Sequence, residues 1–223
     1  MPKLKKELTL IDIFSVASGA MISSGLFILP GLAYAKCGPA IVVSYFLAGL
    51  LAVTGMLSQA ELVSAMPKAG GTYFYITRSM GPAMGMINGL ITWFSLSLKS
   101  VFALVGMAAF TILVVKIDMH IIAIFLTIFF VFVNIMGIKE AGRFQVILVF
   151  ILISVLIFYV IRGFSYVNIS NFEPFIPWGW SSVFSAAGFV FVSYGGLLTV
   201  TSIAEETKEP ARIVPLGMII SLL

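Results

Sequence analysis

The chain has 223 residues, of which 61% are hydrophobic and only 10% are charged, and its formal net charge is +4. A soluble domain of this size needs more charge to cover its surface, so lipid must form part of the solvent of this chain. One cysteine and one histidine exclude an internal disulfide and argue against a thiolate or histidine metal site. The basic residues are scattered between apolar runs, which indicates membrane topology and not nucleic-acid binding.

Six apolar runs are long enough to cross the ~30 Å hydrocarbon core of a bilayer as helices. Such long continuous runs have the wrong period for strands of a membrane β-barrel. The basic start of the chain continues into the first run without a convincing cleavage site, so no signal peptide is expected. The sequence therefore predicts an all-α polytopic membrane protein. The predicted helices cover residues 10–35, 39–65, 83–114, 119–138, 143–162 and 181–204, and a seventh begins near residue 213.

The lysines and arginines favour one side of the predicted membrane. With the N-terminus in the cytoplasm, nine of them lie in inside segments and three, Lys36, Lys116 and Arg162, lie outside. The positive-inside rule then predicts a cytoplasmic N-terminus. The nine inside residues are Lys3, Lys5, Lys6, Lys68, Arg78, Lys139, Arg143, Lys208 and Arg212.

Small, poor helix formers lie within the first and the sixth predicted helices. Ser23-Ser24-Gly25 and Ser193-Tyr194-Gly195-Gly196 are each expected to unwind, since glycine costs about 1 kcal/mol relative to alanine inside a helix. Backbone freed at this depth must face protein or a cavity. There, free N–H groups suit a carboxylate and free carbonyls suit an ammonium or Na⁺. A zwitterionic amino acid carries both groups.

Close helix packing is the alternative interpretation of each small-residue stretch by itself. The two stretches, however, lie five helices apart, which is the spacing of a five-plus-five inverted repeat. This pairing favours a binding site. It also predicts a first five-helix repeat at residues 1–163 and the start of a second repeat at residues 164–223.

Three motifs resemble the amino acid–polyamine–organocation (APC) transporters over essentially the whole chain. The first is the stretch from Gly19 to Phe27, which is similar to G-x-x-x-G-S-G-I-F. The second runs from Glu61 through Pro67-Lys68-Ala69-Gly70-Gly71-Thr72-Tyr73 to Gly81-Pro82. The third joins Phe191–Gly196 to Ala204–Arg212 and Pro215.

The resemblance implies a substrate site between the first and sixth helices. It implies that Ser24 and Gly25 meet the substrate carboxylate, and that the carbonyls of Met21, Val192 and Gly195 meet its ammonium. Tyr194 is the expected aromatic cover, with a gating role. Ser23 replaces a glycine of the family pattern, and Leu198 replaces a frequent acidic residue, which favours a neutral amino acid. The expected substrate-binding residues are Met21, Ile22, Ser23, Ser24, Gly25, Val192, Ser193, Tyr194, Gly195 and Gly196.

Two ionisable residues outside these stretches are further candidates. Lys99 lies in the middle of the third predicted helix, where an ammonium costs a few kcal/mol and faces a partner or a cavity. It can couple transport to protons or replace a sodium ion as a fixed cation. Packing against carbonyls or snorkelling along the helix is the alternative. Glu61, near the cytoplasmic end of the second helix, is a candidate gate residue or a structural ion pair.

The predicted function is secondary active transport of a neutral amino acid across the cell membrane by alternating access. An amino-acid-binding membrane sensor without transport is the alternative, and a channel is disfavoured because helices three to five carry no polar stripe. No catalytic or metal motif is present, so an enzyme and a cofactor are not expected. Protons are the expected coupling ion, with sodium second. The expected partners are the substrate, the bilayer and a missing C-terminal half of the same transporter.

Overall fold

The computed structural model describes residues 6–222, except for the side chains of residues 23, 24 and 138–140. Within this part all regular elements are helical, which confirms the all-α prediction, and one isolated parallel bridge joins Leu8 to Thr207. The α-helices are α1 (Leu10–Phe27), α2 (Leu29–Cys37), α3 (Ile41–Ala65), α4 (Gly71–Met80), α5 (Pro82–Ile112), α6 (Met119–Ile135), α7 (Ile138–Phe164), α8 (Gly179–Tyr194), α9 (Gly196–Thr199) and α10 (Pro210–Leu222). The 3₁₀-helices are η1 (Gly38–Ala40), η2 (Ile169–Phe172) and η3 (Val200–Glu206).

Four helical stretches in the described residues are long and apolar enough to cross a membrane. Three shorter apolar helices, Leu10–Ile22, Met119–Ile135 and Pro210–Leu222, accompany them. A multi-pass membrane protein follows from this composition, whereas the exact number of spans and the inverted repeat stay predictions. The four long stretches are Leu29–Ala65, Pro82–Ile112, Ala141–Phe164 and Gly179–Glu206.

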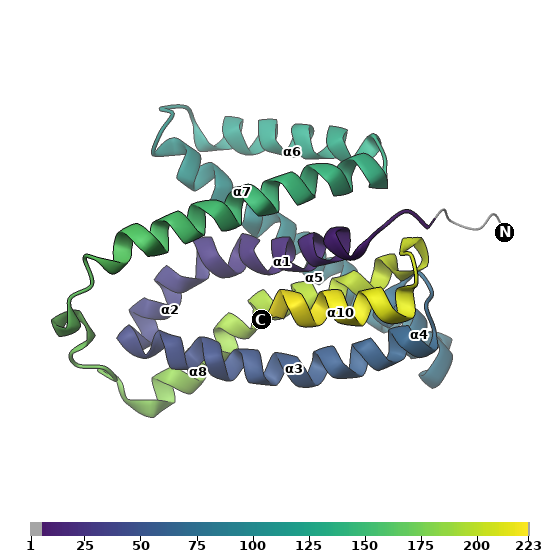
Figure 1. Cartoon of the computed structure of the whole chain (residues 1–223), viewed down its shortest axis with the longest axis horizontal. Coiled ribbons are helices and arrows are strands. Elements are labelled where there is room, and N and C mark those ends of the chain that lie inside the picture. The colour runs from purple at the N-terminus through teal and green to yellow at the C-terminus, as the bar shows by residue number, and fades with distance from the viewer. Residues whose placement is uncertain (1–5, 223) are drawn as a thin grey trace.

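The helix α1 lies in the middle of the molecule. Figure 1 shows α6 and α7 on one side of α1, and α10, α3 and α8 on the other. Most of α7 is apolar and exposed, as expected of a helix that contacts lipid. The short helix α4 and the N-terminal segment lie at the same end of the molecule in this view.

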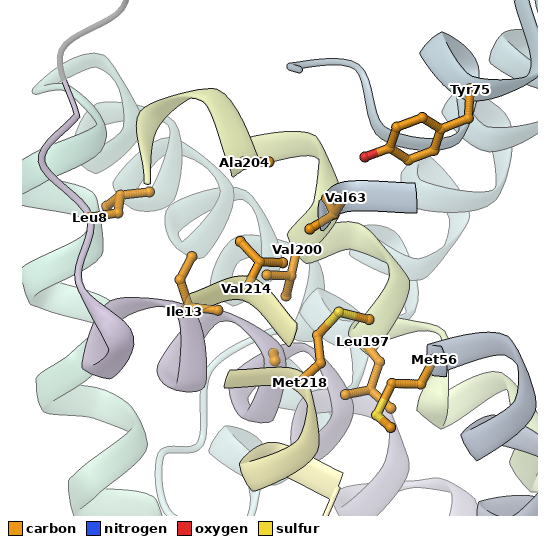
Figure 2. Packing of buried hydrophobic residues seen from close by; sticks show 11 residues of the cluster. Leu8, Ile13, Met56, Val63, Tyr75, Leu197, Val200, Ala204, Val214 and Met218 are labelled. Atoms are coloured by element: carbon orange, nitrogen blue, oxygen red, sulfur yellow. The ribbon is translucent and has the colours of Figure 1, made fainter. Parts of the chain in front are cut away.

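The main hydrophobic core joins α1, α3, α9, η3 and α10. Ile13 of α1, Leu197 of α9 and Met218 of α10 are among its fully buried side chains. Figure 2 shows Leu197, Met56 and Met218 grouped together, with Leu8 and Tyr75 at opposite edges of the cluster. This core fixes α1 against the interrupted second half of the sixth predicted helix.

The first predicted helix is interrupted, but not where the sequence suggested. The backbone of Ser23–Gly25 stays helical, and the break is at Ile28, between α1 and α2. The prediction of unwinding at Ser23–Gly25 is therefore wrong. The reason is Pro30, in the first turn of α2. Proline has no N–H for an i→i−4 bond, and its ring clashes with the carbonyl of residue i−4, at a cost of ~3 kcal/mol that exceeds the cost of Gly25.

The sixth predicted helix changes its geometry at Gly195. α8 ends at Tyr194, Gly195 donates to the Val192 carbonyl at 3.2 Å, and α9 lasts only to Thr199. The chain then continues as the seven-residue 3₁₀-helix η3. Runs of 3₁₀-helix longer than three or four residues are uncommon, and within a longer helix they often mark a hinge.

Candidate functional site

The two small-residue stretches meet directly in space. A Cβ atom added to Gly25 would lie 2.5 Å from the Cβ of Ser193, and one added to Gly196 would lie 2.7 Å from the backbone carbon of Ala20. Both distances are below any normal contact, so only glycine permits this approach of α1 to α8 and α9. The predicted convergence of the stretches is present. At Gly25 and Ser193, however, the helices touch and leave no room for a substrate between them.

The predicted binding residues differ in how far they are buried. Gly25, Ser193 and Gly196 are buried, whereas Met21, Ile22, Tyr194 and Gly195 are half-buried. The side chains of Ser23 and Ser24 lie outside the described residues. Val192 is 60% exposed, so its side chain points away from α1.

Two of the three carbonyls expected to bind an ammonium already accept backbone hydrogen bonds. The Val192 oxygen accepts from the Gly195 N–H at 3.2 Å, and the Gly195 oxygen accepts from the Leu198 N–H at 3.3 Å. The idea that these carbonyls are unpaired is thus wrong for this conformation, because the chain tightens to i→i+3 bonds instead of unwinding. A carbonyl oxygen has two lone pairs, so each retains capacity for a second donor.

Two tyrosine hydroxyls connect the helix ends at this point. The Tyr45 hydroxyl, from α3, donates to the Gly25 carbonyl at 2.7 Å. The Tyr194 hydroxyl donates to the Tyr45 backbone carbonyl at 3.1 Å. Sequence reasoning found Tyr194 but missed Tyr45, because a tyrosine in an apolar helix gives no signal of a partner 20 residues away.

Lys99 lies in α5, and its Nζ atom is buried without a hydrogen-bond partner among the described residues. An ammonium in this situation carries a desolvation cost that no described contact offsets. The described residues thus contain no group that compensates the charge of the Lys99 ammonium. The coupling role stays a prediction.

Contacts between distant segments gather at the N-terminal end of α1. The N–H groups of Glu7 and Leu8 donate to the Glu206 carbonyl at 2.9 and 3.1 Å, and Lys208 N–H donates to the Leu8 carbonyl at 2.9 Å. Glu205 accepts from Ala69 N–H at 3.2 Å and lies 3.7 Å from Lys68 Nζ. We call these contacts, made by residues 7–8, 68–69 and 205–208, the N-terminal clasp.

Glu61 is not part of the N-terminal clasp. Its side chain is exposed on α3, and within the described residues it forms no hydrogen bond or ion pair. The acidic contact at this end of the molecule is made by Glu205 instead. The gating role of Glu61 stays a prediction.

An apolar cavity of about 580 Å³ flanks the other side of α1. It lies between α1, α5, α6 and α7, and its polar lining includes the carboxamides of Asn134 and Gln145. Gln145 Nε2 donates to the Ser15 carbonyl at 3.5 Å, at the limit of a hydrogen bond. None of the lining side chains is ionisable. The cavity suits an apolar or neutral group better than a charged one.

These features together define a class of protein. Helices long and apolar enough to cross a membrane, with two interrupted helices in direct contact, are typical of transporters that bind substrates at discontinuous helices. No catalytic constellation was expected from the sequence, and the relatives below bear permease or transporter names, which agrees with a protein that is not an enzyme.

Comparison with known proteins gives the family. A family model described as "Amino acid permease" matches residues 8–223. The branched-chain amino acid permease BcaP of Bacillus subtilis (strain 168) is 31% identical over 245 residues, which cover 99% of this chain and 52% of the relative. Cationic amino acid transporter 1 of Arabidopsis thaliana is 32% identical over 238 residues (99% and 40%), and the methylthioribose transporter of B. subtilis is 29% identical over 244 residues (98% and 52%).

The chain belongs to the amino acid permease family, as its resemblance to the APC transporters implied. It spans about half the length of the curated relatives it matches, or less.

Proposed function

We propose that this chain forms part of a secondary transporter that moves a neutral amino acid across the cell membrane by alternating access. The observation that carries the proposal is the direct contact of two interrupted helices at Gly25–Ser193 and Gly196–Ala20. Interrupted helices place backbone donors and acceptors at membrane depth, where they can bind both ends of a zwitterion. The substrate site then opens when α1 and α8 move apart.

The residues expected to bind the substrate support a neutral amino acid. A cationic side chain would need a carboxylate near the site, and none of the predicted binding residues carries one. The branched-chain permease among the relatives agrees with this choice, whereas the cationic transporters among them do not. Leu198, which is half-buried and follows α8, supplies no acidic group either.

Alternating access requires one end of the transporter to close while the other opens. We assign closure of the cytoplasmic end to the N-terminal clasp, since it ties the start of α1 to the end of η3. The basic residues Lys68 and Lys208 of the clasp agree with a cytoplasmic location. Lys99 is proposed to couple transport to protons or to act as a fixed cation in place of sodium.

Counterflow in proteoliposomes tests the proposal. The full-length protein is reconstituted into liposomes that are loaded with unlabelled leucine. The entry of labelled leucine is then measured. We expect transient accumulation that excess valine suppresses and that lysine and methylthioribose suppress much less. Leucine binding without counterflow would instead identify a sensor. Suppression by lysine alone would refute the neutral substrate.

A further inference from the structure

Gly25 supplies a carbonyl that the end of α1 leaves without a helical partner. α1 ends at Phe27, so the oxygen of Gly25 is among its last four carbonyls, which lack i+4 donors within the helix. Gly25 itself is buried. A buried carbonyl needs a donor, and the Tyr45 hydroxyl provides it at 2.7 Å.

Tyr45 also receives a hydrogen bond from the other interrupted helix. Tyr194 is the last residue of α8, and its hydroxyl donates to the Tyr45 carbonyl at 3.1 Å. Gly49, one turn further along α3, makes room for this hydroxyl, because a Cβ there would lie 3.3 Å from the Tyr194 oxygen. The tyrosine rings pack with Ala48 and Val190, so their positions are held by the surrounding apolar contacts.

The result is a continuous connection from α8 through α3 to α1. Tyr194 links the end of α8 to Tyr45 through a hydrogen bond. Tyr45 in turn binds the Gly25 carbonyl, which lies next to the Gly25–Ser193 contact. The bond from Tyr45 to Gly25 has the usual length of an O–H···O hydrogen bond, and the bond from Tyr194 to Tyr45, at 3.1 Å, is slightly longer.

We propose that Tyr45 is a positioning residue of the substrate site, which orients the Gly25 carbonyl and couples the end of α1 to the end of α8. This inference rests on the proposed transport function. Loss of the Tyr45 hydroxyl would leave the Gly25 carbonyl buried, unpaired and free to turn. The backbone groups around Gly25 would then present a poorer geometry to the substrate, while the ring of a phenylalanine would still fill the apolar space.

The test compares Tyr45→Phe, Tyr194→Phe and the double variant with the wild type in proteoliposomes, using labelled leucine as the probe. Tyr159→Phe is the matched control, since Tyr159 is 74% exposed on α7 and takes part in neither of these bonds. The loss of one hydrogen bond predicts a rise in KM of about 3- to 10-fold for Tyr45→Phe, with the maximal rate changed by less than about twofold. Tyr194→Phe should raise the KM in the same direction.

The double variant separates coupling from two independent effects. If the two hydroxyls act in one connection, its KM increase is smaller than the product of the single increases. A wild-type KM in Tyr45→Phe overturns the inference, and so does a lowered Tm without a change in KM, because that result indicates a purely structural bond. Wild-type protein without saturable leucine uptake refutes the proposed function, and the inference falls with it.

Discussion

The close approach of the two interrupted helices at Gly196 predicts a strong effect of one added methyl group. Gly196→Ala places a Cβ atom 2.7 Å from the Ala20 carbon and 2.8 Å from the Met21 nitrogen. Both are backbone atoms, so no side-chain rotation can relieve the clash. An ordinary contact begins at 3.4 Å, which means that α9 and α1 must separate by roughly 0.7 Å in a closely packed interior.

Overpacking of this kind costs about 1–3 kcal/mol. We expect Gly196→Ala to lower the stability of the purified protein by that amount, measured as thermal unfolding in detergent. Leucine counterflow should fall as well, because the same contact forms the proposed site. If the helices separate and pack less well, a smaller fraction of the purified protein should also elute as a monodisperse peak in size-exclusion chromatography.

Gly188→Ala is the matched control. It lies in α8, and a Cβ added there meets nothing within 4 Å. Alanine inside a helix is favoured over glycine by up to ~1 kcal/mol, so this variant should be as stable as the wild type or more stable. If Gly196→Ala and Gly188→Ala unfold at the same temperature, α1 and α9 do not approach as closely as described, and the reasoning about the site is refuted.

Two further variants probe coupling and gating. Lys99→Ala should fold normally but lose uptake, or lose the pH dependence of uptake. The control Lys116→Ala, in an exposed loop, should keep both uptake and its pH dependence. Unchanged pH-dependent uptake by Lys99→Ala would exclude the coupling role. Glu205→Gln should change the free energy of unfolding by less than about 1 kcal/mol, as expected for a surface ion pair. When a cysteine replaces the buried Thr201, however, adding Glu205→Gln should speed alkylation of that cysteine several-fold. Equal alkylation rates with and without Glu205→Gln would show that the N-terminal clasp does not control access.

The fold class followed from the sequence because its cause is local. A run of about 20 apolar residues can satisfy its backbone in lipid only as a helix, whatever its neighbours are. The broken character of the sixth helix was visible for the same reason, since Gly195-Gly196 weakens a helix by its own chemistry. Family membership was visible in the motifs around Gly25, Gly71 and Gly196, which the comparison with known permeases confirmed.

The location of the first break was mispredicted because two local effects compete. Ser23-Ser24-Gly25 weakens the helix, but Pro30 removes a hydrogen bond and clashes with the preceding turn, which costs more. The larger effect decided the position. The lesson is physical: a proline a few residues beyond a glycine moves the interruption toward itself.

Contacts between distant residues were outside the reach of sequence patterns. The bond from Tyr194 to Tyr45 spans 149 positions, and the pairing of Leu8 with Thr207 joins the segment before α1 to the segment before α10. The helix α4 was also missed, since its ten residues have too little apolar character to resemble a membrane helix. These features depend on how helices pack, and the periodicity of a single sequence does not show which helices are partners.

The seven-residue 3₁₀-helix η3 lies between two fixed points. Opening of the N-terminal clasp should therefore change the conformation at the substrate site. Gly196 is held against α1, and Thr207 is held by its pairing with Leu8. A 3₁₀-helix rises about 2.0 Å per residue and an α-helix about 1.5 Å, so rewinding all of η3 would shorten it by roughly 3.5 Å. While the clasp holds Thr207, this shortening would pull α9 against α1. Release of the clasp removes that restraint, and Thr201, near the start of η3, is the residue whose exposure then reports the change.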